Sequence, residues 1–379
     1  MTSKTIYFVA GEVSGDNHGA GLMRSLRELC PDLHCIGRGG PQMKAIAGDH
    51  FHDWLDDAAV LGLWEVVKNY RYFRKKFRET IGEIETNNPD AVVLIDYPGF
   101  NLRLARALDA QRNARKIIYY ISPQVWAWNR GRLTYMARWL DLMLCIFPFE
   151  ADLYNQSGLR TRFVGHPMID RLRALKIDHT RDPNLIGLFP GSRRREIGKI
   201  FPVLLETARK LRRRHPQLRF EIAAASPEIG RELEQMLNGE REARAFIRVQ
   251  IGDTAGIMQR AFAGIVASGS ATLEAAYFRL PFVLIYKVSW LTYLAARLVV
   301  KVRYLGMPNV LANKEVVPEF IQHRAEPGAI AKAVLRLVEE PARRAEMISD
   351  FDGIIGSLGE GGASMIAARA VIEEIGDRL

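Results

Sequence analysis

Short apolar runs alternate with longer segments of helical periodicity along most of the chain. Runs of this kind are typical of buried strands, and their alternation with amphipathic helices predicts parallel sheets joined by crossover helices. The expected strands are residues 5–10, 34–37, 91–95, 116–121, 142–146 and 161–164, followed by 185–189, 220–224, 247–251, 264–267 and 282–286. The clearest helical patterns are residues 22–29, 63–86 and 102–112. The expected fold class is therefore α/β.

The strand pattern occurs in two similar series, which predicts two doubly wound, Rossmann-like domains facing a cleft lined by their strand ends. The 379 residues also exceed what one ordinary core holds. Residues 170–184 are polar and carry no strand signal, so we expect domains at residues 1–170 and 185–355. Residues 356–379 are expected to form a C-terminal helix that packs back on the first domain, of the same or a partner chain.

The chain is strongly basic, with a formal net charge of +10 and an isoelectric point near 9.5. This balance favours anionic partners such as nucleic acid, phosphorylated metabolites or an acidic lipid surface. The three cysteines show neither a paired framework nor zinc-ligand spacing, which fits a reducing compartment. With no secretory signal and no apolar run of bilayer length, we expect a cytosolic protein that can associate with a membrane surface.

The turn after the first expected strand reads AGEVSGDNHGAG. Its first three glycines, at positions 11, 15 and 19, lack the GxGxxG spacing of a dinucleotide site, and Arg38 stands near where a ribose-binding carboxylate would be needed. NAD binding is therefore disfavoured. We favour a polar loop at the cleft floor, with Glu12, Asp16 or His18 directed at a substrate. The alternative is that the glycines serve only turn geometry and packing.

The stretch VVLIDYPGFN delivers Asp96 at the carboxyl end of an apolar strand. Pro98 and Gly99 then break the chain before a helix that begins near Asn101. A carboxylate in this position is a natural general base. The equally weighted alternative is an aspartate that caps the helix or stabilises the loop.

The stretch YYISPQVWAWNRGR also follows a strand and places Trp126 and Trp128 beside Arg130 and Arg132. The tryptophans could stack on a sugar ring or line an acyl-chain site. For either tryptophan alone, a place in the domain core is the more common outcome.

The second series opens with LFPGSRRREI, in which a strand ends before Gly191 and Ser192 and three arginines follow from Arg193. Helix N–H groups and guanidinium together form a pyrophosphate cradle. Three arginines at a helix N-terminus oppose the macrodipole unless an anion offsets them, which favours a ligand. The lysine of an ATPase P-loop is missing.

The stretch ASGSATLE is a further strand-to-helix turn. Ser268, Gly269, Ser270 and Thr272 offer small donors for phosphate, and Glu274 could accept hydrogen bonds from ribose hydroxyls. A helix cap with a favourable acidic residue is the alternative, but the arginine loop of the same domain strengthens the nucleotide interpretation.

Two segments concern surfaces. Residues 68–78 interleave basic and aromatic side chains in an amphipathic pattern that can lie on an anionic bilayer. For residues 290–305, a core helix with a basic face is favoured. The eight histidines form no HxH or HExxH pattern, and no DxD follows a strand, so no metal site is expected.

Taken in order, these motifs resemble the bacterial lipid A disaccharide synthase family, glycosyltransferase family 19, over residues 10–309. The matching stretches are AGEVSGDNHGA, IDYPGFN, SPQVWAW, FPFE, FVGHP, FPGSRRREI, ASGSATLE and MPN. The resemblance implies a GT-B enzyme that joins UDP-2,3-diacylglucosamine to 2,3-diacylglucosamine 1-phosphate. The products would be a β-1,6-linked disaccharide 1-phosphate and UDP, formed with inversion and without a metal or other cofactor.

The resemblance also assigns roles to residues. Asp96 is the leading general base, with His18 in reserve, and Arg193 offsets charge on the departing UDP. The donor-site residues are Gly191, Ser192, Arg193, Ser268, Gly269, Ser270, Thr272, Glu274 and Asn309. The acceptor-site residues are Glu12, Ser14, Gly15, Asp16, Asn101 and Trp126. The first domain would bind the acceptor and face the anionic cytoplasmic side of the inner membrane, and the resemblance allows a homodimer.

This sequence departs from the family pattern where Gly99 replaces an acidic residue, and where SGT becomes Ser268-Gly269-Ser270. The nearest alternative is another GT-B enzyme acting on UDP-N-acetylglucosamine, either a peptidoglycan-type transferase or a 2-epimerase. It would not explain IDYPGFN or SPQVWAW. A nucleic-acid-binding module is disfavoured, because the basic residues do not gather on a recognition element.

Overall fold

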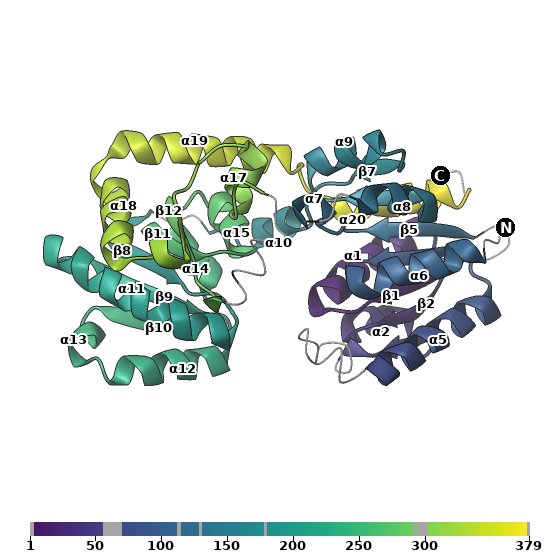
Figure 1. The fold of residues 1–379 in the computed structure, drawn as a ribbon, viewed down its shortest axis with the longest axis horizontal. Coiled ribbons are helices and arrows are strands. Elements are labelled where there is room, and N and C mark those ends of the chain that lie inside the picture. Colours follow the sequence, from purple (N-terminus) through teal and green to yellow (C-terminus); the bar gives the residue numbers. More distant parts are fainter. Residues whose placement is uncertain are drawn as a thin grey trace. The chain divides into compact units, whose positions relative to one another are not determined.

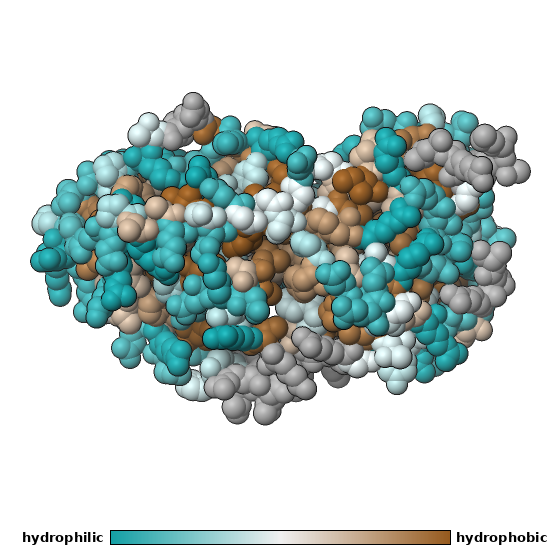
Figure 2. Space-filling model, turned by 90° about the horizontal axis from the view of Figure 1, so that it is seen from above, coloured by the Kyte–Doolittle hydropathy of each residue, from teal (hydrophilic) through white to brown (hydrophobic). Residues whose placement is uncertain are grey.

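The computed structural model describes residues 4–55, 70–111, 115–128, 131–177, 180–290, 293 and 302–376. The chain divides into two compact units. Unit 1 comprises Met1–Pro167 and Leu358–Leu379, and unit 2 comprises Met168–Ser357. On the face shown in Figure 2, hydrophilic side chains cover most of each unit, and hydrophobic residues are exposed in smaller patches.

Unit 1 is built on a seven-stranded sheet in the order β3-β2-β1-β4-β5-β6-β7, with every pair parallel. Its strands are β1 (Thr5–Ala10), β2 (His34–Gly39), β3 (Phe51–Asp53), β4 (Ala91–Ile95), β5 (Lys116–Tyr120), β6 (Leu142–Cys145) and β7 (Thr161–Phe163). Its helices are α1 (Val13–Leu29), α2 (Pro41–Ala47), α5 (Tyr70–Asn87), α6 (Pro98–Ala110), α7 (Val125–Trp128), α8 (Arg132–Trp139), α9 (Pro148–Gln156) and α20 (Ala363–Glu374).

The helices of unit 1 form two packed groups. Helix α1 packs against α2 and α20, whereas α6 packs against α5 and α8 and covers a large apolar cluster with β1, β4 and β5 (Figure 1). Because all strands run parallel, their carboxyl ends share one edge of the sheet, and the loops that leave this edge can carry a site.

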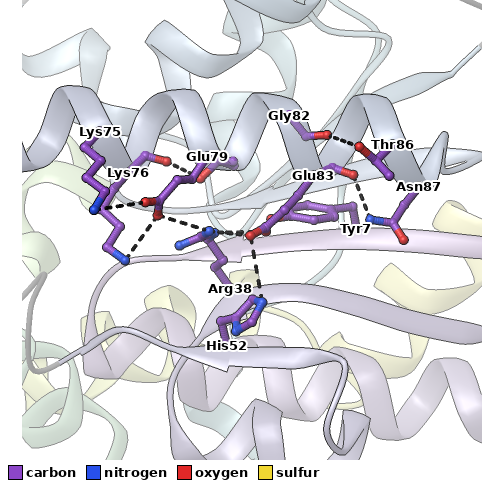
Figure 3. Close-up of polar contacts among 11 residues, drawn as sticks. Tyr7, Arg38, His52, Lys75, Lys76, Glu79, Gly82, Glu83, Thr86 and Asn87 are labelled. Carbon is purple, nitrogen blue, oxygen red and sulfur yellow. Dashed lines mark hydrogen bonds and ion pairs between the residues drawn. The ribbon is translucent and has the colours of Figure 1, made fainter.

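Helix α5 is tied to the sheet by a polar network around Arg38, which lies at the end of β2 (Figure 3). The buried Arg38 guanidinium donates two hydrogen bonds to Glu83, and the Tyr7 hydroxyl donates a third at 2.6 Å. Burial acts to raise the pKa of Glu83, but the bonds from Arg38 and Tyr7 prevail and lower it. His52 and Glu79 complete the network. Arg38 therefore anchors a helix.

Unit 2 contains a six-stranded parallel sheet in the order β10-β9-β8-β11-β12-β13. Its strands are β8 (Asp182–Phe189), β9 (Arg219–Ala224), β10 (Ile247–Ile251), β11 (Ala261–Ala267), β12 (Phe282–Tyr286) and β13 (Glu319–Ile321). Its helices are α10 (Met168–Ala174), α11 (Arg194–Arg214), α12 (Pro227–Asn238), α13 (Arg241–Arg244), α14 (Thr254–Arg260), α15 (Ala271–Tyr277), α17 (Met307–Ala312), η1 (Gln322–Arg324), α18 (Pro327–Glu339) and α19 (Pro341–Ser357).

The α/β class and the predicted strands are confirmed, with small shifts at their ends. The expectation that residues 170–184 contain no strand is wrong. These residues contain most of α10 and the first residues of β8. The predicted helix 63–86 is present from Tyr70 to Asn87, and residues 63–69 lie outside the described residues. Two short strands, β3 and β13, were not predicted.

Candidate functional site

The carboxyl ends of β1 and β4 bring two carboxylates together in unit 1. Parallel pairing aligns the last residues of these strands; Asp96 follows β4 directly, and Glu12 lies two residues after the end of β1. Burial raises the pKa of Asp96 to about 6, and the charge of Glu12 adds to the rise. Ser14, which is exposed, and His18, which is half-buried, continue along α1. A carboxylate that ionises near neutral pH at an open strand end is suited to general-base catalysis.

The backbone at Asp96 has an uncommon conformation that neighbouring side chains stabilise through hydrogen bonds. Asp96 and Tyr97 both have left-handed φ angles, 46° and 50°, a costly arrangement for residues other than glycine. The Asn101 amide donates to the carbonyls of Asp96 at 2.8 Å and Ile95 at 3.2 Å, and the Tyr119 hydroxyl donates to the Asp96 carbonyl at 2.6 Å. Asn101 is fully buried, which favours a supporting role for it over the predicted acceptor contact.

Asp16 is almost completely buried and is engaged by the backbone. Its carboxylate accepts hydrogen bonds from the N–H groups of Gly40, Gln42 and Met43, at 2.9–3.0 Å. These donors belong to the start of α2. The Asp16 carboxylate, on α1, therefore caps the N-terminus of α2 by accepting hydrogen bonds from its free N–H groups. This arrangement favours a structural role for Asp16 over the predicted acceptor contact.

Two glycines of the first turn, Gly11 and Gly19, are required by packing. A Cβ at Gly11 would lie 2.3 Å from the Tyr97 ring, and one at Gly19 would lie 2.4 Å from the sulfur of Met43. A Cβ at Gly15 would meet ordinary contacts, starting at 3.4 Å. The alternative interpretation, that these glycines serve helix–sheet packing, thus holds for Gly11 and Gly19.

Trp126 lies in α7, the short helix in the segment that follows β5, and is buried rather than open to a ligand. Its indole N–H donates to Glu150 at 2.9 Å, and its ring contacts Phe149 edge-on at 5.0 Å between centroids. Glu150 was not singled out from the sequence. The side chain of Trp128 and residue Arg130 lie outside the described part of the chain.

The predicted pyrophosphate loop follows β8 in unit 2. Gly191 has a φ of 97°, in the left-handed region where glycine is favoured, and Ser192 is exposed beside it. Arg193 is the N-cap residue of α11, and its exposed guanidinium contacts Glu196 at 3.1 Å. Exposed donors at a helix N-terminus are suited to an anionic ligand.

The neighbouring turn follows β11. Gly269 has a φ of 146°, and Gly269 and Ser270 are exposed. Ser268 donates its backbone N–H to Ile285. The Thr272 hydroxyl is buried and donates to the Gly269 carbonyl at 2.8 Å. Thr272 therefore stabilises the turn, and this bond favours a structural role over the predicted phosphate contact.

Glu274 stands in the first turn of α15 and is held by a partner that the sequence did not suggest. Arg171, on α10, donates to its Oε1 at 2.7 Å. Glu274 is mostly buried and Arg171 more than half exposed. One carboxylate oxygen is thus fixed in place, which orders the side chain for a contact through the other.

Asn309 is fully buried, and its side chain is saturated with internal bonds. It donates to the Val317 carbonyl and to Glu319, both at 2.8 Å, and accepts from the N–H groups of Val316 and Val317. An amide with both donors and its acceptor occupied has little left for a ligand. This geometry favours a structural role for Asn309 over the predicted donor contact.

Comparison with known proteins adds the family. The model of the lipid-A-disaccharide synthetase family matches residues 6–360. The chain is 39% identical to the lipid-A-disaccharide synthase of Geobacter sulfurreducens, with 100% of this chain and 99% of the relative covered. It is 36% identical to lipid-A-disaccharide synthase 1 of Legionella pneumophila, with 98% of each covered.

Solved structures share the fold at low identity. A putative UDP-N-acetylglucosamine 2-epimerase from Listeria monocytogenes has a TM-score of 0.66 at 13% identity, with 100% of this chain and 98% of the other covered. The UDP-GlcNAc 2-epimerase from Neisseria meningitidis, bound to UDP-GlcNAc, has a TM-score of 0.62 at 13% identity, covering 98% of this chain and 100% of the other. Together with the two parallel sheets, these likenesses establish a GT-B fold.

Proposed function

Because the chain belongs to the lipid-A-disaccharide synthase family, we propose that it joins UDP-2,3-diacylglucosamine to 2,3-diacylglucosamine 1-phosphate. The family is one of glycosyltransferases that use a nucleotide-sugar and a lipid-sugar. The products would be the β-1,6-linked disaccharide 1-phosphate and UDP. The single observation that carries the proposed chemistry is Asp96, a carboxylate with a raised pKa at the carboxyl end of β4.

We assign acceptor activation to unit 1. Asp96 takes the proton of the acceptor's 6-hydroxyl, the oxygen attacks the anomeric carbon from the opposite face, and the bond to the UDP oxygen breaks. The carboxylate must be ionised to act, and burial, with the charge of Glu12, raises the pKa of Asp96 to about 6, where the ionised group accepts a proton effectively. His18 is the reserve base.

Donor binding is assigned to unit 2. The loop of Gly191, Ser192 and Arg193 would receive the diphosphate, helped by the exposed turn at Ser268–Ser270. Arg193 would offset the charge that develops on the departing UDP, and no metal is required in this scheme. Glu274, ordered by Arg171, would accept hydrogen bonds from the ribose hydroxyls.

A basic face on α5 supports the proposed membrane surface. Arg71, Arg74, Lys75 and Arg78 are exposed at helical spacing, so they share one side of the helix. Such a stripe attracts anionic lipid, and both proposed substrates carry acyl chains. Residues 68 and 69, and most of 290–305, lie outside the described residues. Within the described part of the chain, no helix has the length and apolar character needed to span a bilayer.

Mass spectrometry of the products tests the assignment. Purified protein is incubated with UDP-2,3-diacylglucosamine and the diacylated monosaccharide phosphate, and in parallel with UDP-N-acetylglucosamine. The expected result is a disaccharide phosphate and UDP from the acylated pair only. Conversion of UDP-N-acetylglucosamine instead would support the alternative transferase or epimerase and overturn the proposal.

Sedimentation with vesicles tests the surface. Binding to vesicles that contain anionic lipid is compared for the wild type and a variant carrying Arg71→Glu, Arg74→Glu and Arg78→Glu. We expect the variant to lose binding at low salt, because each basic residue contributes about 1 kcal/mol near an anionic surface. Equal binding by both proteins would exclude α5 as the docking element.

A further inference from the structure

A buried carboxyl group in unit 1 has no part in the chemistry proposed so far. Glu150 is only 1% exposed and stands in the first turn of α9, directly after β6. Its Oε1 accepts the hydrogen bond from the Trp126 indole at 2.9 Å, and its Oε2 accepts one from the Phe147 N–H at 3.3 Å. Burial raises the pKa of Glu150 to about 7. A carboxyl group is costly to bury, so its presence here requires an explanation.

The first turn of α9 and the loop after β5 form one packed layer. The Trp126 ring meets Phe149 edge-on, and Phe149 stacks with Phe147 at 6.0 Å between centroids. Phe147 in turn contacts the His166 ring at 5.2 Å. The Glu150–Trp126 hydrogen bond is a polar link within this aromatic layer, and it sets the orientation of the indole.

The carboxyl end of β5 is hydrogen-bonded to Asp96, the residue assigned as general base. The backbone N–H of Asp96 donates to the Tyr120 carbonyl at 3.0 Å, and the Asp96 carbonyl accepts from the Tyr119 hydroxyl. Both backbone groups of Asp96 are thus held by the last two residues of β5. Trp126 lies six residues further along that chain segment, so its anchor restrains the loop that leaves this strand end.

We propose that Glu150 is a positioning residue for the acceptor site: through Trp126 it holds the loop after β5 against the strand end that supports Asp96. This inference rests on the proposed function, because it names the lipid-sugar acceptor as the substrate whose binding depends on Glu150. Without the carboxyl group, the buried indole N–H loses its acceptor, and the loop must move to satisfy it.

Steady-state kinetics at saturating UDP-2,3-diacylglucosamine, with the diacylated monosaccharide phosphate varied, test the proposal in the full chain. Glu150→Gln keeps an oxygen for the indole and gives up only the longer bond from the Phe147 N–H, so its acceptor KM should stay close to that of the wild type. Glu150→Leu should raise the acceptor KM by about 10- to 100-fold, as a displaced binding element does. The Kd for UDP, measured by calorimetry, should not change. Asp152→Asn, an exposed carboxylate on the same helix, is the matched control and should behave like the wild type.

A second variant keeps the test decisive. Trp126→Phe removes the indole donor together with part of the ring and should also raise the acceptor KM, and the Trp126→Phe, Glu150→Leu double variant should be no worse than Glu150→Leu alone. If Glu150→Leu does not fold, Trp126→Phe decides the matter. An unchanged acceptor KM in the folded variants, or a parallel loss of UDP binding, would overturn the positioning role. If wild-type protein makes no disaccharide at all, it is the proposed function that fails instead.

Discussion

Replacing Asp96 by asparagine should make the protein more stable and much less active. The carboxylate is held at a strand end where burial and the nearby charge of Glu12 disfavour its ionised form. Asparagine has nearly the same shape and no charge, so Asp96→Asn relieves this conflict and removes the general base. Opposite changes in stability and turnover are the mark of a residue retained for function.

The magnitude follows from the pKa of Asp96. It rises from 3.8 to about 6 on folding, and each tenfold change in ionisation is worth about 1.4 kcal/mol. The ionised side chain therefore costs the folded state about 3 kcal/mol. This cost is complete above about pH 6, fades as the pH falls, and is lost below 3.8, where the group is protonated in both states. At about pH 8 the variant should gain at most this amount, or about 6–12 °C in melting temperature for a unit of this size.

Thermal unfolding at about pH 8 and about pH 4 checks the stability, and product formation checks the activity. Turnover should fall roughly 10²- to 10⁴-fold, as loss of a general base implies. In the wild type, kcat/KM should decline below about pH 6 as Asp96 becomes protonated.

Asp90 provides the control, because it directly precedes β4 and its pKa is shifted in the opposite direction to that of Asp96. Burial acts to raise its pKa, but the Thr5 N–H at 2.9 Å and Lys4 at 3.1 Å outweigh burial and lower it. Asp90→Asn should therefore lose stability at about pH 8. The reasoning is refuted if Asp96→Asn gains no stability at that pH, or gains as much at about pH 4. Unchanged turnover would remove Asp96 from the base role.

Two further substitutions test packing and donor binding. Gly11→Ala should lower the free energy of unfolding by about 1–3 kcal/mol, because its Cβ would overlap the Tyr97 ring, whereas Gly99→Ala meets open space and should be neutral or stabilising by chemical denaturation. Equal effects of the two would contradict the close approach at Gly11. Arg171→Ala should raise the KM for the nucleotide-sugar by freeing Glu274, and Arg171→Lys should bring the KM part of the way back to the wild-type value. An unchanged KM in Arg171→Ala would mean that the ion pair does not prepare the ribose contact.

Strands with a continuous apolar run could be predicted from the sequence because the run itself reports burial on both faces. β4 is completely buried and was predicted with its observed bounds. β3 and β13 have three residues each and lie at the edges of their sheets, and the polar residues His52, Asp53 and Glu319 leave no apolar run to mark them. The segment 170–184 was misassigned because polar residues at the start of β8 hide a strand whose apolar part begins at Leu185.

The placement of candidate site residues was predictable where it depends only on the position directly after a strand. Asp96 directly follows β4 and therefore lies at the carboxyl end of this central strand. Asp16 and Asn309 are polar residues in motifs too, but their partners are backbone groups several residues or a whole element away. A sequence does not distinguish a carboxylate that faces a ligand from one that caps a helix across the fold.

Partners distant in sequence were missed for a related reason. Arg171 and Glu274 are 103 residues apart, and Trp126 and Glu150 are 24 apart. Nothing local predicts either pair, because the contacts exist only once the sheet order is known. The one available signal for Glu150 was an acidic residue among the apolar side chains of FPFE, directly after an expected strand.

The path of the backbone has a consequence for protein synthesis. Unit 1 is interrupted after Pro167 and resumes at Leu358, and its last helix, α20, packs along α1. A ribosome delivers α20 only after all of unit 2 has emerged. Unit 2 can therefore complete its fold before unit 1, and until α20 is made part of the apolar side of α1 stays uncovered. Chaperone contacts during translation should therefore concentrate on the N-terminal segment of unit 1.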